Sequence, residues 1–96
     1  MQIIENWSDV DGEVSELLQN PSDPSFAVAK VRVHASTPVG SFANLLTKDV
    51  GNEIAIRVPN TAVQRLGLAP GHRVHMRVRQ TGVDKYFSPP EAIERK

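Results

Sequence analysis

The amino-acid sequence predicts a mainly β domain, an antiparallel sheet or small barrel of about five strands with one or two short helices. Three segments carry this prediction, because apolar and polar residues alternate along residues 29–34, 52–58 and 73–79. Alternation with a period of two places the apolar side chains on one face of a strand. Strands of this kind are typical of antiparallel sheets with one buried and one solvated face.

Two weaker strands complete the expected sheet, over residues 12–18 and 83–87. Turn-forming residues at 21–25 separate the first two strands, and a second cluster at 36–40 ends the second strand. The expected core consists of the inward apolar residues of the three clearest strands and the neighbouring helix: Val31, Val33, Ile54, Ile56, Val58, Val63, Leu66, Leu68, Val74, Met76 and Val78.

Helical spacing predicts a short helix over residues 60–66, with Asn60 or Thr61 as its N-cap and Gly67 in the left-handed conformation at its end. A second helix of one or two turns is expected over residues 41–46, whose apolar side chains would close one end of a barrel.

The remaining connections are read from proline and glycine. Pro70 and Gly71 fit the two central positions of a type II turn. The polar residues 89–96 follow two prolines and are expected to fray. We therefore expect a single domain over residues 1–96, with the barrel at about residues 10–88.

Composition narrows the class of protein. The chain has 96 residues, 11 basic and 11 acidic side chains, a formal net charge of 0 and no cysteine, which excludes a thiol nucleophile and cysteine-bound metals. No apolar run approaches the roughly 20 residues of a membrane span, and the N-terminal segment is acidic where a signal peptide is basic. We expect a cytoplasmic protein without membrane insertion, and the small size favours a homo-oligomer.

Charge is unevenly distributed along the chain. Residues 1–25 contain acidic but no basic side chains, whereas residues 57–79 contain five arginines, two histidines and no acidic residue. The basic segment is either an anion or nucleic-acid surface, or it is neutralised by the acidic segment packed across it. The zero net charge favours the second interpretation, because phosphate binding depends on excess positive charge.

The sequence contains no pattern that predicts catalysis. It has no phosphate-binding loop, no dinucleotide-binding glycine motif and no nucleophile elbow. His72 and His75 would point to opposite faces of a strand, so they would not share a metal ion, and His34 is expected on an outer strand face. We expect a protein that binds and is not an enzyme, with no catalytic residue and no metal site.

Aromatic residues leave alternatives open. Trp7, the only tryptophan, is either a stacking or interface residue or a cover for one end of the barrel together with Ile3 and Ile4. Of the neighbours Tyr86 and Phe87, one should be buried and the other exposed, because they lie on one strand.

Residues 52–79 resemble the second half of Mop-type and TOBE (transport-associated oligonucleotide-binding-fold) domains. They read as a strand, a short helix, the turn Leu-Gly-Leu-Ala-Pro-Gly and a second strand. Upstream, residues 5–14 are similar to the entry segment with its Gly-x-Val start, and residues 27–33 to the second strand. This resemblance implies a five-stranded antiparallel OB-like barrel that binds molybdate, tungstate or a similar oxyanion, or that serves as a regulatory accessory of a transporter ATPase.

The same resemblance implies a set of ligand-binding residues. They are the polar residues at positions that match the family's motifs: Ser8, Asn60, Thr61, Arg79 and Thr81. Glu5 departs from the family pattern and would repel an anion. Residues 38–51 are an insertion relative to compact Mop domains.

A second resemblance competes for the same segment. Residues 56–59, Ile-Arg-Val-Pro, followed by residues 66–71 are similar to AbrB/MazE-type swapped-hairpin DNA-binding domains. That resemblance implies a transcriptional regulator or antitoxin whose nucleic-acid face is formed by Arg57, Arg73, Arg77 and Arg79. Binding of a small ligand is therefore the first expectation, and binding of DNA is the alternative.

Overall fold

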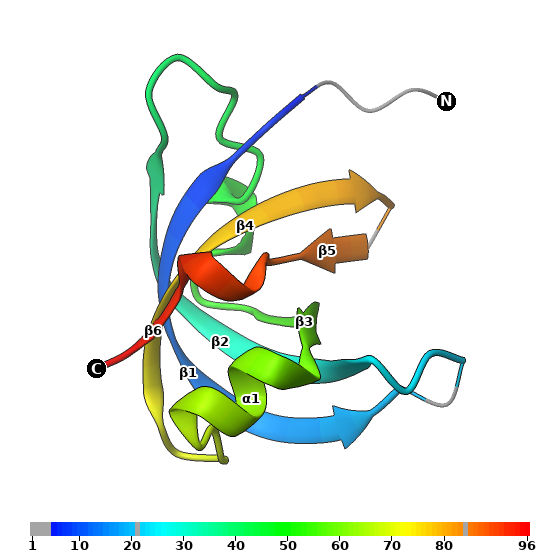
Figure 1. The fold of residues 1–96 in the computed structure, drawn as a ribbon. Coiled ribbons are helices and arrows are strands. Elements are labelled where there is room, and N and C mark those ends of the chain that lie inside the picture. Colours follow the sequence, from blue (N-terminus) through cyan, green and yellow to red (C-terminus); the bar gives the residue numbers. More distant parts are fainter. Residues whose placement is uncertain (1–4, 21, 84) are drawn as a thin grey trace.

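The computed structural model describes residues 5–20, 22–83 and 85–96 (Figure 1). Its strands are β1 (Ser8–Gln19), β2 (Phe26–Pro38), β3 (Glu53–Pro59), β4 (Arg73–Gly82), β5 (Lys85–Phe87) and β6 (Ile93–Arg95). Its helices are α1 (Asn60–Leu66) and the short 3-10 helices η1 (Thr47–Asp49) and η2 (Pro90–Ala92). No helix within the described ranges is both long and apolar enough to cross a bilayer.

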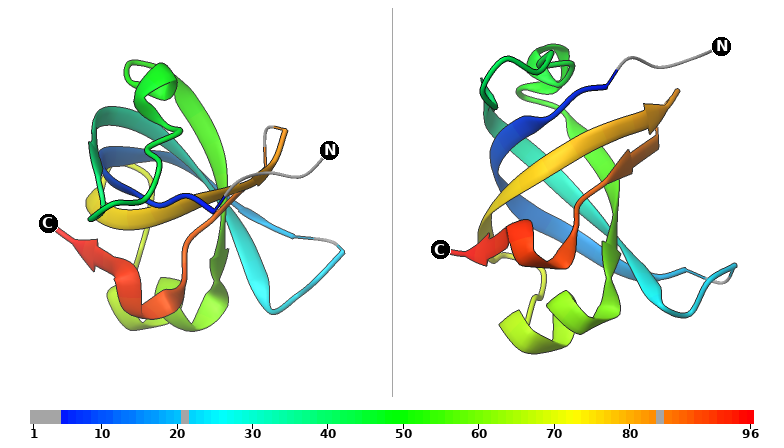
Figure 2. Two further views of the ribbon diagram at one scale, coloured as in Figure 1. Left: turned by 90° about the horizontal axis from the view of Figure 1, so that it is seen from above. Right: turned by 45° about the horizontal axis from the view of Figure 1, so that its top comes forward.

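Five strands close into a barrel in the order β1-β2-β3-β5-β4, because β4 also pairs with β1. The predicted mainly β barrel is confirmed. Its pairings are antiparallel except that of β3 with β5, which is parallel. The parallel pairing follows from the topology: β4 runs antiparallel to β1 and β5 antiparallel to β4, so β5 runs in the direction of β3. Helix α1 and the segment joining β2 to β3 lie at opposite ends of the barrel (Figure 2).

The core contains nine of the eleven predicted residues, which are less than a tenth exposed. The other two, Val63 and Leu66, are only partly buried, since α1 turns Ala62 fully inward. The alternation also extends beyond the predicted strands, and the buried apolar residues outside the predicted core are Val10, Val14, Ala27, Ala29, Leu46, Ala62, Tyr86 and Ile93.

Most strands are longer than predicted. β2 spans Phe26–Pro38 against the expected 29–34, so the turn cluster at residues 36–40 does not end it until Pro38. β1 begins at Ser8, four residues before the expected start, and this extension carries the buried Val10. β5 begins only at Lys85, because β4 continues to Gly82 and Val83 lies in the turn between the two strands. As expected, one of these two neighbours is buried: it is Tyr86, and Phe87 lies on the outer face with partial exposure.

Helix α1 has the predicted bounds, and Gly67 ends it with φ 59° and ψ 41°. The predicted cap is wrong: Pro59 occupies the N-cap position and no side chain caps the helix. The Asn60 amide instead donates to the Pro24 carbonyl oxygen of the β1–β2 connection. Thr61 is exposed.

The turn into β4 has the predicted type II character. The His72 backbone N–H donates to the Ala69 carbonyl oxygen at 3.2 Å across Pro70 and Gly71. Gly71 has φ 93°, a conformation that side chains with a Cβ rarely adopt.

The predicted helix over residues 41–46 is wrong. The only helical turn between β2 and β3 is η1, which starts at Thr47. Asn44 competes with a helix here, because its side-chain Oδ1 accepts hydrogen bonds from the Ser8 and Ser36 hydroxyls and from the Leu46 backbone N–H. Leu46 is fully buried at this end of the barrel, so one apolar residue of the segment does close it.

The predicted fraying of residues 89–96 is also wrong. These residues form η2 and β6, and β6 pairs antiparallel with the first half of β4. Ile93 lies opposite Met76 and is 1% exposed, so burial of its side chain holds the segment in place. The domain therefore continues past the expected barrel limit at residue 88.

Candidate ligand-binding face

Acidic residues of β1 neutralise part of β4. The Arg77 Nε donates to Asp9 Oδ1 at 3.2 Å, and His75 Nδ1 lies 2.8 Å from Asp11 Oδ1. Lys96 Nζ lies 2.7 Å from the same Asp11 oxygen. The pairing of β1 with β4 thus brings the acidic N-terminal segment across the basic one, as one of the two interpretations of the sequence predicts.

These contacts predict a pH-dependent contribution to stability. The hydrogen bond from Lys96, and then that from His75, lowers the pKa of the Asp11 carboxyl. The contribution is present above the usual aspartate pKa and is lost as the pH falls below about 4. Asp11→Asn should lower the melting temperature slightly at pH 7, since exposed ion pairs contribute at most about 1 kcal/mol, and the deficit should vanish in acid.

Thermal melts of both proteins across the acid range check this expectation. Glu91→Gln is the control, since Glu91 is exposed and has no ion pair within the described ranges. A deficit of Asp11→Asn that persists at the lowest pH would contradict the ion pair as its cause.

A row of outward-facing residues runs across neighbouring strands of the barrel, from the residue before β1 over β4, β5 and β3 to β2. Arg79 of β4 lies opposite Phe87 of β5, Phe87 pairs with Arg57 of β3, and Arg57 lies opposite Val28 of β2. Trp7 precedes Ser8, whose partner is Val78, so Trp7 stands next to Arg79. We call Trp7, Arg79, Phe87, Arg57 and Val28 the arginine row.

Both arginines of the row lie over aromatic rings. The Arg57 Cζ is 5.0 Å from the ring centroid of Phe26 and 5.4 Å from that of Phe87. The two phenylalanine rings are 6.2 Å apart in an edge-to-face arrangement. The Arg79 Cζ is 5.9 Å from the Trp7 ring. These contacts favour positions of the two guanidinium groups over the rings.

No carboxylate among the described residues forms an ion pair with Arg57 or Arg79. The positive charges of Arg57 and Arg79 are therefore not compensated by a neighbouring carboxylate within the described ranges, whereas Asp9 neutralises the charge of Arg77. An uncompensated guanidinium that is held by an aromatic ring is prepared to receive an anionic group, because little side-chain entropy remains to be lost.

An open groove of about 190 Å³ lies on this face, lined by Asn20, Val28, Ala55, Arg57, Thr81, Lys85 and Tyr86. Its walls come from Asn20, the residue after β1, from β2 and β3, and from the strands on either side of the β4–β5 turn. The exposed Lys85 adds a third cation.

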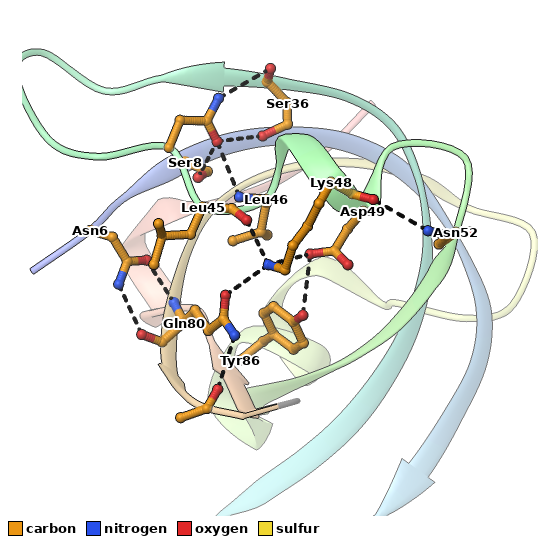
Figure 3. Close-up of polar contacts among 12 residues, drawn as sticks. Asn6, Ser8, Ser36, Leu45, Leu46, Lys48, Asp49, Asn52, Gln80 and Tyr86 are labelled. Atoms are coloured by element: carbon orange, nitrogen blue, oxygen red, sulfur yellow. Dashed lines mark hydrogen bonds and ion pairs between the residues drawn. The ribbon is translucent and has the colours of Figure 1, made fainter. Parts of the chain in front are cut away.

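Tyr86 lines this groove. Its side chain also contacts the segment between β2 and β3 (Figure 3). Its hydroxyl donates to Asp49 Oδ2 at 3.2 Å. The Lys48 ammonium donates to the Leu45 carbonyl oxygen, to the same Asp49 carboxylate and to Gln80 Oε1. The bonds of Lys48 to Gln80 and of Asp49 to Tyr86 attach the β2–β3 segment to the barrel end.

The structure does not gather the five residues expected to bind an oxyanion. Ser8 is fully buried, and its hydroxyl donates to Asn44 at 2.6 Å, at the barrel end closed by the β2–β3 segment (Figure 3). Asn60 and Thr61 begin α1, at the opposite end (Figure 1). Only Arg79 and Thr81 share one outer face, two positions apart on β4.

The four arginines of the alternative nucleic-acid face are also divided. Arg57 and Arg79 belong to the arginine row, whereas Arg77 is paired with Asp9. Arg73 lies at the start of β4, opposite Glu13 of β1. Two of the four expected arginines therefore lie together in the arginine row.

The histidines form no common site. His72 Nδ1 accepts the Ala69 backbone N–H, and His75 contacts Asp11. His34 is exposed on β2, as expected. Within the described ranges, no cluster of three or more His, Asp or Glu side chains is arranged to hold a metal ion.

The sequence does not identify Phe26 and Lys85 as residues of this face, and it does not place Phe87 beside Arg57 and Arg79. An outward position in the alternation of a strand is the only signal that the sequence carries for them, and strand register decides which residues stand beside them. Trp7 is partly exposed beside Arg79, while Ile3 and Ile4, its expected partners at the barrel end, lie outside the described residues.

Function must be inferred from the face itself. No protein-family model matches this chain, and neither a curated protein nor a solved structure matches it.

Proposed function

We propose that this protein is a non-enzymatic binding module whose arginine row holds a single strand of nucleic acid. One observation carries the proposal: two arginines without ion pairs among the described residues alternate with aromatic rings across adjacent strands. Proteins that bind single strands combine such cations with aromatic side chains, on which the bases stack.

The aromatic residues and the arginines of the row have different roles in this proposal. The partly exposed rings of Trp7 and Phe87 offer faces for bases, and the Arg57 and Arg79 guanidiniums bind phosphates or extend the stacked surface. The two arginines flank Phe87, so they lie about 10 Å apart along the sheet. This spacing suits contacts to different nucleotides of one strand.

The position of the groove supports the same ligand. A five-stranded barrel with a helix between β3 and β4 is similar to an OB fold, which binds oligonucleotides over its second and third strands and between the β1–β2 and β4–β5 loops. The groove with Val28 and Arg57 lies over β2 and β3. Asn20 and Lys85 place it beside both connections.

Single substitutions in the row should weaken binding. Arg57→Ala and Arg79→Ala should each reduce affinity for an oligothymidylate about tenfold at low salt, since each removes a charge-assisted contact. Each should also reduce the slope of log affinity against log salt concentration by about 0.7, the value for one phosphate contact on a single strand. Fluorescence anisotropy of a labelled oligothymidylate measures both quantities.

Arg73→Ala is the matched control, because it removes the same charge from an exposed position at the far end of β4. Its effect should stay within about twofold. Equal losses in all three variants would indicate a diffuse charge effect, and an absence of binding at low salt would reject nucleic acid as the ligand.

An oxyanion is the second candidate, favoured by the common outer face of Arg79 and Thr81. If the site takes molybdate or a similar ion, molybdate should raise the melting temperature, and Thr81→Ala should remove the rise. That result without oligonucleotide binding would replace the first proposal by the second.

A further inference from the structure

We infer that a second groove, over the outer face of β1 and β4, binds an extended peptide segment of a partner protein in which basic and apolar residues alternate. This inference does not depend on nucleic-acid binding, because it concerns a groove whose lining includes carboxylates.

The floor of this groove belongs to two paired strands. Asp9 of β1 lies opposite Arg77 of β4, and His75 lies two positions earlier on β4. The space above them is open and has a volume of about 470 Å³, which suits a bound side chain or short peptide segment. Arg77 is half-exposed, and beyond the Nε that donates to Asp9 its guanidinium carries further N–H groups that can donate to peptide carbonyl oxygens.

Two unlike walls flank the floor. β2 pairs with β1, and β6 pairs with the edge of β4 that faces away from β1, so the β2–β3 segment and the C-terminal segment stand on opposite sides. The first wall is apolar and contains Val39 and Phe42, the latter 40% exposed. The second wall carries the exposed Glu91 and Glu94.

The charges of the groove select a cation. Glu91 and Glu94 form no ion pair within the described ranges, whereas Asp9 and Arg77 compensate each other. A phosphate group would therefore be repelled by the second wall, and a lysine or arginine side chain would be attracted to it. The charge of this groove is opposite to that of the arginine row, so the two faces suit different ligands.

The two walls set the pattern of the peptide. Successive side chains of an extended chain point to opposite sides, so alternate residues would face the two walls. Basic side chains suit the second wall, where Pro89 and Ala92 can pack against their aliphatic stems. Apolar side chains suit the first wall, where they would cover Phe42. A free amine offers no carbonyl oxygen to Arg77 and leaves the first wall uncovered, so the lining favours a peptide.

Four labelled peptides of equal length test the pattern by fluorescence anisotropy: Leu-Arg-Leu-Arg-Leu, Leu-Glu-Leu-Glu-Leu, Asn-Arg-Asn-Arg-Asn and Leu-Leu-Leu-Arg-Arg, each between Gly-Ser ends. The first should bind at least about fivefold more tightly than each of the others, because it alone presents both charge and apolar surface to the matching walls. The last has the same composition as the first and isolates the effect of alternation. Spermidine at equal concentration should not displace the first peptide.

Substitutions in the two walls test the site. The double variant Glu91→Gln/Glu94→Gln should weaken binding of the first peptide about fivefold, and Phe42→Ala about threefold. Glu53→Gln and Val83→Ala are the matched controls, since they remove a carboxylate and an apolar side chain that are exposed outside this groove. Both controls should stay within about twofold of the wild type.

Three results would overturn the inference: no binding of the first peptide at millimolar concentration, equal affinity for the rearranged peptide, or equal losses in the wall variants and the controls. Light scattering identifies another occupant. Self-association that the Glu91→Gln/Glu94→Gln variant abolishes would place a second copy of the chain in the groove instead of a partner's peptide. None of these results bears on oligothymidylate binding, so the proposed function is tested separately.

Discussion

Ile56→Asp is expected to abolish cooperative unfolding of the domain at 25 °C. Ile56 is fully buried on β3, where it pairs with Ala29 on one side and Tyr86 on the other. The substitution removes apolar burial and places a carboxylate in the core without a partner, a change that costs several kcal/mol. Domains of this size are stable by about 5–15 kcal/mol, so most of the folded population should be lost.

Ala55→Asp is the matched control, because Ala55 is the next residue of the same strand and points outward. Circular dichroism during thermal melting should show a wild-type-like transition for this variant and none for Ile56→Asp. A wild-type melting temperature for Ile56→Asp would show that the facing of β3 is wrong.

Leu46→Ala is expected to lower the free energy of unfolding by about 2–5 kcal/mol. Leu46 is fully buried at the barrel end that the β2–β3 segment covers. Truncating it leaves a cavity, and neighbouring groups have little freedom to fill it because Asn44 and Lys48 are held by hydrogen bonds. Urea denaturation measures the difference in unfolding free energy.

Phe42→Ala belongs to the same segment but removes a side chain that is 40% exposed. Its effect should be below about 1 kcal/mol. Similar losses for the two variants would mean that Leu46 has no special role in closing the barrel.

The sequence predicts the barrel strands correctly where apolar and polar residues alternate, because the alternation alone fixes which side chains face the core. Residues 52–58 and 73–79 alternate strictly, and their inward residues are buried as expected. The helix predicted over residues 41–46 is wrong, because the helical spacing of apolar residues does not reveal that Asn44 bonds to Ser8 and Ser36 on two strands of the barrel. The fraying predicted for residues 89–96 is wrong for a similar reason, since the burial of Ile93 depends on the pairing of β6 with β4.

The candidate face depends on register, which one sequence does not display. Arg57 and Arg79 can be identified from charge alone, yet Arg77 has the same pattern and is neutralised by Asp9. The parallel pairing of β3 with β5 brings Phe87 beside Arg57, and the β1–β4 register brings Trp7 beside Arg79. Local spacing predicts strands and charges, while contacts between distant strands decide which charges remain available.

A titration of ¹⁵N-labelled protein with a six-nucleotide oligothymidylate, followed by backbone and indole N–H chemical shifts, shows whether the arginine row binds a single strand. We expect the largest shift changes on the arginine row and on the residues beside it: Trp7, Phe26, Val28, Arg57, Arg79, Lys85 and Phe87. The Trp7 indole signal is a unique reporter, because the chain has one tryptophan. Shift changes centred on α1 or on the groove lined by His75, Glu91 and Glu94, with the arginine row unaffected, would show that the row does not bind the strand.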